Sequence, residues 1–562
     1  MLKHFTDEQQ SKKLATDDMQ SKKLLIVCIL SLFITLFLPN AGWISLAPPM
    51  IAILSAIITQ NVIFSLGLAV VIGGITKQIT TGEQVYTNIF NAGKSSFGYL
   101  HATLTDVVNL EILGFAATTL VMIAVVVNAG GMQGIIQWLI KRINSRKSAS
   151  FTTFLLGVCI FIDDYANTMI VGASMRSITD YYRISREKLA FIVDATSAPI
   201  AGIAIISTWV SYEVGLFTET AKAIGINQNG YSILFDALGY RFYCIFMLIF
   251  LVINILSDRD FFTMLTAEKE ALKATPKTNK ENTAKKDVSY DKSVNIHPLT
   301  ATLPILSILV FVFIGLWIDG KGSLLLASHS FFDVSFWQTL LSQSENVTLV
   351  LLISSLSSLA VAVICSLTIA KLSPLMTLKA ILAGIKKSLF PLIVLVLAWS
   401  LKKSCDDLET DKFIVQALGD SLSPILFPII LFLISGAMAF STGTSWGTMA
   451  ILIPMAIPMA YSLDGEMYGL VTIICCGAIL DGAIFGDHCS PVSDTTVLSS
   501  ISCECDHIQH VKTQAPYALI VAMLAIFIGY FPAGFGMSSF YSIIAVILIS
   551  ILIFKLFGKK AI

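Results

Sequence analysis

Long apolar segments alternate with short polar loops along most of this chain. A membrane-spanning helix needs about 20 consecutive, predominantly apolar residues, and many stretches approach that length. In the first half they are Leu24–Leu38, Ile44–Ile58, Val62–Ile75, Leu110–Val127, Phe151–Met175, Leu189–Val210 and Tyr240–Leu256. In the second half they are Leu303–Trp317, Val347–Ala370, Leu389–Leu401, Ile425–Tyr461, Leu470–Phe485, Tyr517–Phe531 and Tyr541–Phe554. The pattern predicts an all-α polytopic membrane protein with about 12 spanning helices plus two hairpins.

Composition strengthens this interpretation. Of the 562 residues, 55% are hydrophobic and 13% are charged, and the mean hydropathy is +0.79, which excludes an ordinary soluble globule. The chain has 37 basic residues (lysine plus arginine) and 37 acidic residues (aspartate plus glutamate). Its net charge therefore does not favour a nucleic-acid partner. The sequence contains no glycine-rich phosphate-binding loop, so we expect no ATP drive and no cofactor.

Polar and basic stretches divide the chain and orient it. Residues 1–23 predict a cytoplasmic N-terminal tail, and residues 258–297 predict a flexible, lysine-rich cytoplasmic linker. A first transmembrane half, residues 24–257, precedes the linker, and a second half, residues 298–562, follows it. Because lysine and arginine concentrate in cytoplasmic loops, the basic residues near each end of the chain place both termini in the cytoplasm.

The segment Phe151–Met175 does not fit a simple crossing. Basic residues flank it on both sides: Lys141, Arg142, Arg146 and Lys147 before it, and Arg176, Arg183, Arg186 and Lys188 after it. Both ends therefore favour the cytoplasm, which a re-entrant hairpin satisfies and a single span does not. Ile425–Tyr461 is too long for one span and carries the polar sequence FSTGTSWGT in its middle. We expect a second hairpin there, entering from outside.

The two halves resemble each other at these points. In a comparison of the two halves, FIDDYANTM at Phe161–Met169 corresponds to FSTGTSWGTM at Phe440–Met449. Downstream, DATSAPIAGIAIIST at Asp194–Thr208 lies opposite GDHCSPVSDTTVLSS at Gly486–Ser500, and the shared proline predicts a broken helix in each half. Since the hairpins enter from opposite faces, the sequence predicts two inverted-topology repeats with re-entrant hairpins and broken helices, an organisation of secondary transporters with midplane binding sites.

The acid pair Asp163 and Asp164 is the sharpest candidate for a binding site. A charged side chain at the bilayer centre costs about 2.5–3.5 kcal/mol even on lenient scales, so function is the first explanation to test. A buried carboxylate that holds either H⁺ or Na⁺ couples the two flows by competition. Asn167 and Thr168 lie one helical turn further and could share that face. The alternative is that the acids cap the hairpin tip or pair with Arg176 or Arg183, and that Asn167 and Thr168 bond the backbone.

Further candidates lie at the other predicted breaks. Asp194 and Thr196 precede Pro199 in an otherwise apolar segment, and the hydroxyls of Thr442, Thr444 and Ser445 suit hard cations. The most polar intramembrane run supplies Asp487, His488, Ser490, Asp494 and Thr495. Packing and capping remain alternatives for the hydroxyl residues, and a structural hydrogen bond remains one for His488.

Other polar residues have plainer interpretations. We expect Asp481 to pair between helices, and Trp209, Tyr212 and Glu213 to mark an interfacial helix end near the outside. The sequence CECDHIQH, with Cys503, Cys505, His507 and His510, does not have a standard zinc-ligand spacing.

Two long motifs resemble a known family. FIDDYANTMIVGASMRSITDYYRISREKLAFIVDATSAP is similar to one signature of the NhaC-type Na⁺/H⁺ antiporter family, within the broader ion transporter superfamily. GDHCSPVSDTTVLSSISCECDHIQHVKTQAPYAL resembles that family's second signature, and the resemblance runs roughly from Leu110 to Phe531. It implies sodium–proton exchange in a prokaryotic inner membrane on a fold of two inverted repeats. Members of the family also exchange organic acids against sodium or protons.

We therefore predict a secondary active transporter that exchanges cytoplasmic Na⁺ for external H⁺ through competition at buried carboxylates. The candidate Na⁺ ligands are Asp163, Asp164, Asp194, Asp487 and Asp494. The alternative is a Na⁺- or H⁺-coupled transporter of a small organic acid or amino acid. An intramembrane aspartyl protease is disfavoured because adjacent acids diverge on a helix, whereas that chemistry needs two carboxyls sharing a proton.

The partners follow from this prediction. We expect Na⁺ and H⁺, with a small carboxylate or amino acid in the alternative, in contact with the lipid bilayer and without nucleic acid. A homodimer is a candidate assembly.

Overall fold

The computed structural model describes residue 27 and residues 43–80, 85–140, 143–273, 295–326, 330–331, 333–410, 413 and 423–561. Within these ranges the fold is helical, and one isolated bridge joins Asp260 to Lys559. The first-half helices are η1 (Trp43–Leu46), α2 (Ala47–Thr59), α3 (Val62–Thr80), α4 (Val85–Thr105), α5 (Val107–Asn128), α6 (Gly131–Ile140), α7 (Arg146–Cys159), α8 (Asp164–Tyr181), α9 (Arg186–Ala195), α10 (Ala198–Ile203), α11 (Thr208–Ile224), α12 (Gly230–Ala237), η2 (Leu238–Tyr240), α13 (Phe242–Ser257) and α14 (Phe262–Lys273).

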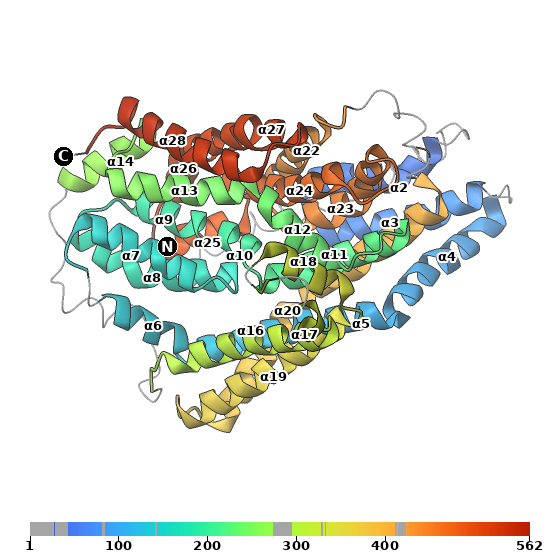
Figure 1. Ribbon diagram of the computed structural model, residues 1–562, viewed down its shortest axis with the longest axis horizontal. Coiled ribbons are helices and arrows are strands. Elements are labelled where there is room, and N and C mark those ends of the chain that lie inside the picture. The colour runs from blue at the N-terminus through green and yellow to red at the C-terminus, as the bar shows by residue number, and fades with distance from the viewer. Residues whose placement is uncertain are drawn as a thin grey trace, which may run out of the picture. The chain divides into compact units, whose positions relative to one another are not determined.

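The remaining helices continue the chain to its C-terminal part. They are α16 (Leu299–Asp319), α17 (Gly322–Leu325), α18 (Val334–Gln343), α19 (Val347–Thr368), α20 (Pro374–Asp407), α22 (Phe427–Thr442), α23 (Ser445–Leu463), α24 (Leu470–Cys489), α25 (Asp494–Ser502), α26 (His507–Leu524), η3 (Ala525–Tyr530), α27 (Phe531–Gly534) and α28 (Ser539–Leu556). Figure 1 shows α13 beside α26 and α28, from opposite halves of the chain, and these helices are in contact.

By length and composition, nine helices of the described residues could cross a membrane, or up to 11 if each bent helix pair is one span. The prediction of an all-α polytopic membrane protein is therefore confirmed. The first predicted span, Leu24–Leu38, and the tail 1–23 lie outside the described residues apart from Val27. The apolar pattern missed α4, because its sequence VYTNIFNAGKSSFGYLHATLT mixes polar and apolar residues throughout.

The chain forms two compact units, and each is described by itself. The smaller comprises the described parts of Met1–Thr105 and Ile393–Ser421. In it, Lys77 of α3 pairs with Asp407 of α20, and Tyr99 of α4 donates to the same carboxylate at 3.1 Å. The larger comprises the described parts of Asp106–Leu392 and Leu422–Ile562 and contains every candidate site residue.

The first predicted hairpin is present in the larger unit. Helix α7 has 14 residues, so it is about 21 Å long at 1.5 Å per residue, shorter than the bilayer's apolar core. Beyond the end of α8, the Tyr182 hydroxyl donates to the Ile143 carbonyl ahead of α7 at 3.3 Å. Near the tip, the Asn167 amide of α8 donates to the Gly157 carbonyl of α7 at 2.8 Å. The chain therefore turns at Ile160–Asp163 and returns to the end from which it came, which we call the open end of hairpin 1.

The second hairpin consists of α22 and α23. Asp464, just after α23, accepts from the backbone of Thr472 at the start of α24 at 2.7 Å, so α23 and α24 run in opposite directions. Helix α22 runs parallel to α24, because Ser435 donates to the Ile479 carbonyl and Ser490 donates to the Phe440 carbonyl, both at 2.7 Å. Helices α22 and α23 are therefore antiparallel, and hairpin 2 opens where α24 begins.

The two hairpins open at opposite ends. Helix α9 begins at the open end of hairpin 1, and α9–α10 continues into α11 with a bend of 43°. Beyond α11, Asp236 of α12 accepts from the Tyr468 hydroxyl at 3.1 Å, which places α12 at the open end of hairpin 2. The inverted arrangement predicted from loop charges is thus present in the fold.

One predicted break has an unpredicted companion, and one prediction needs correction. The first-half helix breaks at Thr196–Ser197, just before Pro199, as the proline pattern predicted. A second break follows at Ala204–Ser207, where the chain bends before α11. Pro199 lies in the first turn of α10, where its missing N–H costs nothing. The predicted flexible linker 258–297 begins too early, because Phe262–Lys273 forms α14, which buries Met264 and Glu268. Residues 274–294 lie outside the described residues.

Candidate functional site

The tips of both hairpins meet the breaks of both broken helices in the interior of the larger unit. At hairpin 1, the backbone N–H of Thr208 donates to the Ile162 carbonyl at 2.9 Å. At hairpin 2, the Tyr212 hydroxyl of α11 donates to the Trp446 carbonyl of α23 at 2.7 Å. The Trp209 and Trp446 rings pack edge to face, 5.9 Å apart. One broken helix therefore contacts both tips.

Four helices begin at this level, and each begins with a polar cap. The capping side chains are Asp163 for α8, Ser207 for α11, Thr444 for α23 and Ser493 for α25, and each accepts a hydrogen bond from the first turn of its helix. Helix N-termini present unpaired N–H groups and partial positive charge. Their convergence lowers the cost of placing carboxylates here.

The carboxylates of Asp194 and Asp487 lie together behind these caps. Asp194 Oδ2 accepts from Gln514 Nε2 at 2.6 Å and from Thr496 Oγ1 at 3.1 Å. Asp487 Oδ2 accepts from Thr495 Oγ1 at 2.9 Å. Both acids are 1% exposed, so two negative groups from different halves occupy one buried region.

Asp494 and the hairpin acids complete the group. Tyr165, next to Asp164 on α8, donates its hydroxyl to Asp494 Oδ2. Asp494 also acts electrostatically on Asp164 and Asp487. All five predicted carboxylates therefore belong to one neighbourhood, which includes Asp163 and Asp487 from opposite halves.

Several buried oxygens of this group have no hydrogen-bond partner among the described residues. They are Asp164 Oδ1, Asp487 Oδ1 and Asn167 Oδ1. Buried polar atoms are nearly always paired in folded proteins, so each unpaired one needs a specific explanation. Acceptor-only oxygens of this kind suit a hard cation or a proton.

The remaining predicted residues contribute mainly to the frame. The Asn167 amide reaches Gly157, Ile160 and Thr196 carbonyls, which fastens hairpin 1 to the end of α9. The Thr168, Thr196 and Thr442 hydroxyls donate to carbonyls of their own helices. Ser490 bonds α22, and Ser445 is buried beside its capping neighbour Thr444.

His488 links the acids to another helix. Its Nδ1 lies 2.9 Å from the Tyr243 hydroxyl, and its Nε2 lies 3.9 Å from Asp194 Oδ2. The His510 Nε2 atom lies at the same distance, 3.9 Å, from that oxygen and hydrogen-bonds Gln514 at 2.8 Å. The sequence had given no role to Tyr165, Gln514, Thr496 or His510 in this cluster, because their partners lie hundreds of positions away.

A cavity of about 730 Å³ opens onto the acids. Asp163, Tyr165 and Asp494 line one side, and Thr444 and Trp446 of hairpin 2 line another. Asn128 at the end of α5 and Lys387 of α20 also face it, and Lys387 acts electrostatically on Asp163. Asp494 and Asp163 line the cavity, and Asp194 and Asp487 do not.

Some sequence interpretations were wrong at this site. Trp209, Tyr212 and Glu213 are not interfacial, since their exposed fractions are 0%, 1% and 0%. They lie on α11 just after the break at hairpin tip 1, where polar groups gather. Asp481 pairs between helices as expected, with Arg241 Nε 2.9 Å from its Oδ1. In the cysteine–histidine motif, His507 and His510 both hydrogen-bond Ser500.

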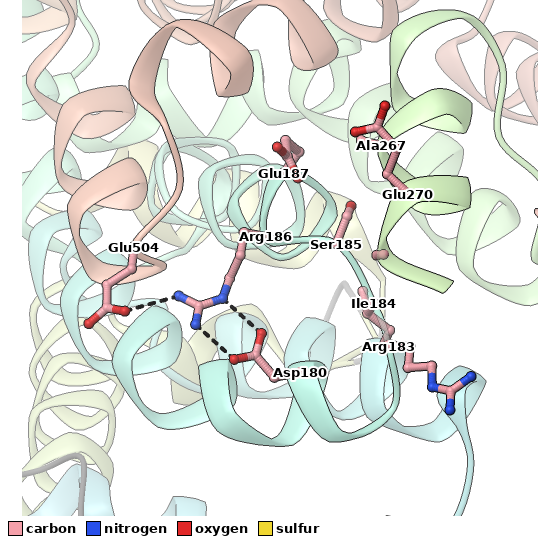
Figure 2. Close-up of a pocket in the computed structure, with 10 residues that line it drawn as sticks. Asp180, Arg183, Ile184, Ser185, Arg186, Glu187, Ala267, Glu270 and Glu504 are labelled. Atoms are coloured by element: carbon pink, nitrogen blue, oxygen red, sulfur yellow. Dashed lines mark hydrogen bonds and ion pairs between the residues drawn. The ribbon is translucent and has the colours of Figure 1, made fainter. Parts of the chain in front are cut away.

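A second pocket, of about 420 Å³, lies at the open end of hairpin 1. Figure 2 shows Arg186 between Asp180 and Glu504. Its guanidinium contacts Asp180 of α8 at 2.7 Å and Glu504, beyond α25, at 3.3 Å. Arg176 pairs with Glu504 as well. These ion pairs join the two halves at the open end of hairpin 1, and none of them includes an acid of the carboxylate cluster.

Comparison with known proteins places the chain in a family. The model of the Na⁺/H⁺ antiporter family matches residues 200–535. An uncharacterized protein of Haemophilus influenzae is 32% identical over 505 residues, which cover 88% of this chain and 91% of that protein. The Malate-2H(+)/Na(+)-lactate antiporter of Bacillus subtilis is 35% identical over 117 residues, 20% of this chain and 24% of that protein. The Arginine/ornithine antiporter ArcD of Halobacterium salinarum is 30% identical over 135 residues, 24% of this chain and 27% of that protein.

These matches agree with the helical membrane fold. The chain is a multi-pass membrane protein and a secondary transporter, and it belongs to the Na⁺/H⁺ antiporter family.

Proposed function

We propose that this protein exchanges Na⁺ for H⁺ at the group formed by Asp163, Asp164, Asp194, Asp487 and Asp494. The observation that carries the proposal is the set of buried carboxylate oxygens, Asp164 Oδ1 and Asp487 Oδ1, that have no partner among the described residues. Carboxylate, hydroxyl and carbonyl oxygens are the ligands that hard cations prefer. Thr495, which donates to Asp487, and Thr444, which lines the cavity with Asp163 and Asp494, are candidate neutral ligands.

Competition at these acids is sufficient to couple the two ions. Several carboxylates in one buried region cannot all ionise without counter-charge, so they hold either protons or a cation. Binding of cytoplasmic Na⁺ releases protons, and protons arriving from outside displace Na⁺ on the other face. The opposed hairpins suit this cycle, because each tip reaches the same acids from one side of the membrane.

Proton release from purified protein tests the proposal. In weakly buffered detergent solution, added Na⁺ should acidify the medium, and choline at equal ionic strength should not. The apparent Na⁺ affinity should fall as the pH is lowered, because protons compete for the same oxygens. Absence of Na⁺-dependent proton release across the pH range would contradict competition.

A second candidate is coupled exchange of a small organic acid or amino acid. The cavity of about 730 Å³ is larger than a single ion needs, and Lys387 in its wall could face a carboxylate. The malate/lactate and arginine/ornithine antiporters among the relatives handle such solutes. Counterflow of labelled malate, lactate, arginine and ornithine in proteoliposomes separates the candidates. Solute uptake that depends on Lys387 would favour this one.

We further propose that the protein lies in a prokaryotic inner membrane with both termini in the cytoplasm. The proposal rests on the loop charges and on the opposed open ends of the hairpins. Under it, the ion pairs of Arg186 face the cytoplasm and Tyr468 faces outside. Cysteine labelling from either side checks this orientation, and cross-linking in the membrane checks for a homodimer.

A further inference from the structure

A second buried charge cluster is connected to the carboxylate group through Tyr243 and His488. The transport scheme above does not use this cluster. It consists of Glu213 on α11, Arg241 at the start of α13 and Asp481 on α24, and the side chains of all three have exposed fractions of 0%. Their presence in the interior therefore needs its own explanation.

Both carboxylate oxygens of Asp481 accept hydrogen bonds. Its Oδ1 accepts from Arg241 Nε at 2.9 Å, and its Oδ2 accepts from the Tyr243 backbone at 2.6 Å and the Tyr530 hydroxyl at 2.9 Å. Both Asp481 oxygens therefore have donors, and one of these donors is the guanidinium. The Arg241–Asp481 contact is a hydrogen bond at normal distance, whereas the contact of Arg241 with Glu213 is longer.

Glu213 is the surplus acid. Arg241 Nη1 lies 3.5 Å from Glu213 Oε1, and neither Glu213 oxygen has a hydrogen-bond partner among the described residues. Arg241 and Asp481 are the charged groups that act on it. The other acidic groups of helices packed on α11 have partners elsewhere, namely Glu111 with Thr348 and Asp236 with Gln338 and Tyr468. Two acids with one base leave one negative charge uncompensated in a buried site unless Glu213 binds a proton.

The position of Glu213 connects it to transport. Tyr212, its neighbour on α11, holds the tip of hairpin 2 through Trp446, and Thr208 holds the tip of hairpin 1 through Ile162. On the Arg241 side, Tyr243 joins Asp481 through its backbone and His488 through its hydroxyl. Glu213 therefore lies on the helix that contacts both tips, and its neighbour Arg241 is connected through Asp481 and Tyr243 to His488.

We propose that Glu213 is a second proton-carrying site of the antiporter, distinct from the acids that bind Na⁺. One proton binds a Glu213 oxygen from outside while the site is open to that face, and the same proton leaves to the cytoplasm after the hairpins move. Arg241 and Asp481 stay paired throughout, so the cluster alternates by one charge. This inference rests on the proposed Na⁺/H⁺ exchange and adds one proton to each cycle.

The proton-to-sodium ratio of Glu213→Gln tests it. In proteoliposomes with fixed Na⁺ gradients, the pH gradient at which Na⁺ flux reverses gives that ratio. Exchange should persist in Glu213→Gln, because the Na⁺-binding acids remain, but the ratio should fall by one proton per Na⁺. Glu219→Gln, on the same helix, is the matched control and should keep the native ratio.

The outcomes separate the two proposals. If the native protein shows no Na⁺/H⁺ exchange, the proposed function fails. If native protein exchanges and Glu213→Gln has the native ratio, this inference alone is overturned. Should Glu213→Gln not fold, Glu213→Asp keeps an acid: its protonated-carboxyl band in pH-difference infrared spectra should shift from the native position, and an unshifted band would equally overturn the proposal.

Discussion

The two halves of the larger unit use the same construction with different chemistry. In each, a helix that follows the break starts at a serine cap, Ser207 for α11 and Ser493 for α25, and packs on the second arm of the other half's hairpin. A tyrosine fastens each contact: Tyr212 of α11 bonds the backbone of α23, and Tyr165 of α8 bonds Asp494 of α25. The backbone arrangement is therefore duplicated with inverted direction.

The charges are not duplicated. Hairpin 1 carries acids at its cap and first helical position, Asp163 and Asp164, where hairpin 2 carries Thr444 and Ser445. At the breaks the order is reversed, since Asp494 begins α25 whereas Thr208 begins α11. The repeat therefore supplies four convergent helix ends. The acids at two of them, the starts of α8 and α25, make the interior suitable for cations.

The largest expected effect is that of Asp487→Asn, which removes a buried acid of the second half. We expect Na⁺-dependent proton movement in vesicles to fall at least about a hundredfold, or about 2.8 kcal/mol at about 1.4 kcal/mol per tenfold. Asp464→Asn is the matched control, because Asp464 caps the opposite end of the same helix and asparagine also caps well. Equal exchange by native protein and Asp487→Asn would rule out the carboxylate cluster as the site.

The comparison of the hairpin tips is sharpened by Asp163→Asn and Thr444→Asn. Asparagine preserves an N-cap, so the first variant removes a charge while keeping the turn, and the second exchanges a cap without changing charge. We expect exchange to fall about tenfold to a hundredfold in Asp163→Asn, roughly 1.4–2.8 kcal/mol, and to change less than about threefold in Thr444→Asn. Similar losses in both variants would mean that the tips contribute shape and not charge.

A smaller effect is expected from the paired tyrosines. Tyr165→Phe removes a donor to the Asp494 carboxylate, and hydrogen bonds to charged groups contribute about 1.5–3 kcal/mol. Tyr212→Phe removes a donor to a neutral carbonyl, which contributes about 0.5–1.5 kcal/mol. Isothermal titration with Na⁺ should show altered affinity for Tyr165→Phe, whereas Tyr212→Phe should lower thermal stability alone. If Na⁺ affinity changed in Tyr212→Phe and not in Tyr165→Phe, the bond to the Asp494 carboxylate of α25 would not be the one that matters for Na⁺ binding.

The smallest effect is expected from removing the ion pairs at the open end of hairpin 1. Arg186→Gln breaks the contacts with Asp180 and Glu504, and Glu504 is 60% exposed at its side chain. Exposed pairs contribute about 0–1 kcal/mol and are screened by salt. For a chain of this length the melting temperature should drop by about one degree or less at low salt, and the difference from native protein should shrink in high salt. A salt-independent loss of exchange would indicate a direct role in the pathway.

The sequence by itself determined most of the apolar helical segments, the polar breaks and the hairpin of Phe151–Met175, because apolar length and loop charge are local properties that the bilayer imposes on each segment separately. It missed α4, whose sequence mixes polar and apolar residues. It also indicated the acids, since charged residues in apolar surroundings are visible without knowing their neighbours. The tertiary structure decided which groups meet. Asp194 finds Gln514 and Thr496, and Glu213 finds Arg241 and Asp481, across separations that no local pattern encodes. Such pairs depend on how helices from two halves pack, and packing follows from the whole set of buried surfaces and not from any one segment.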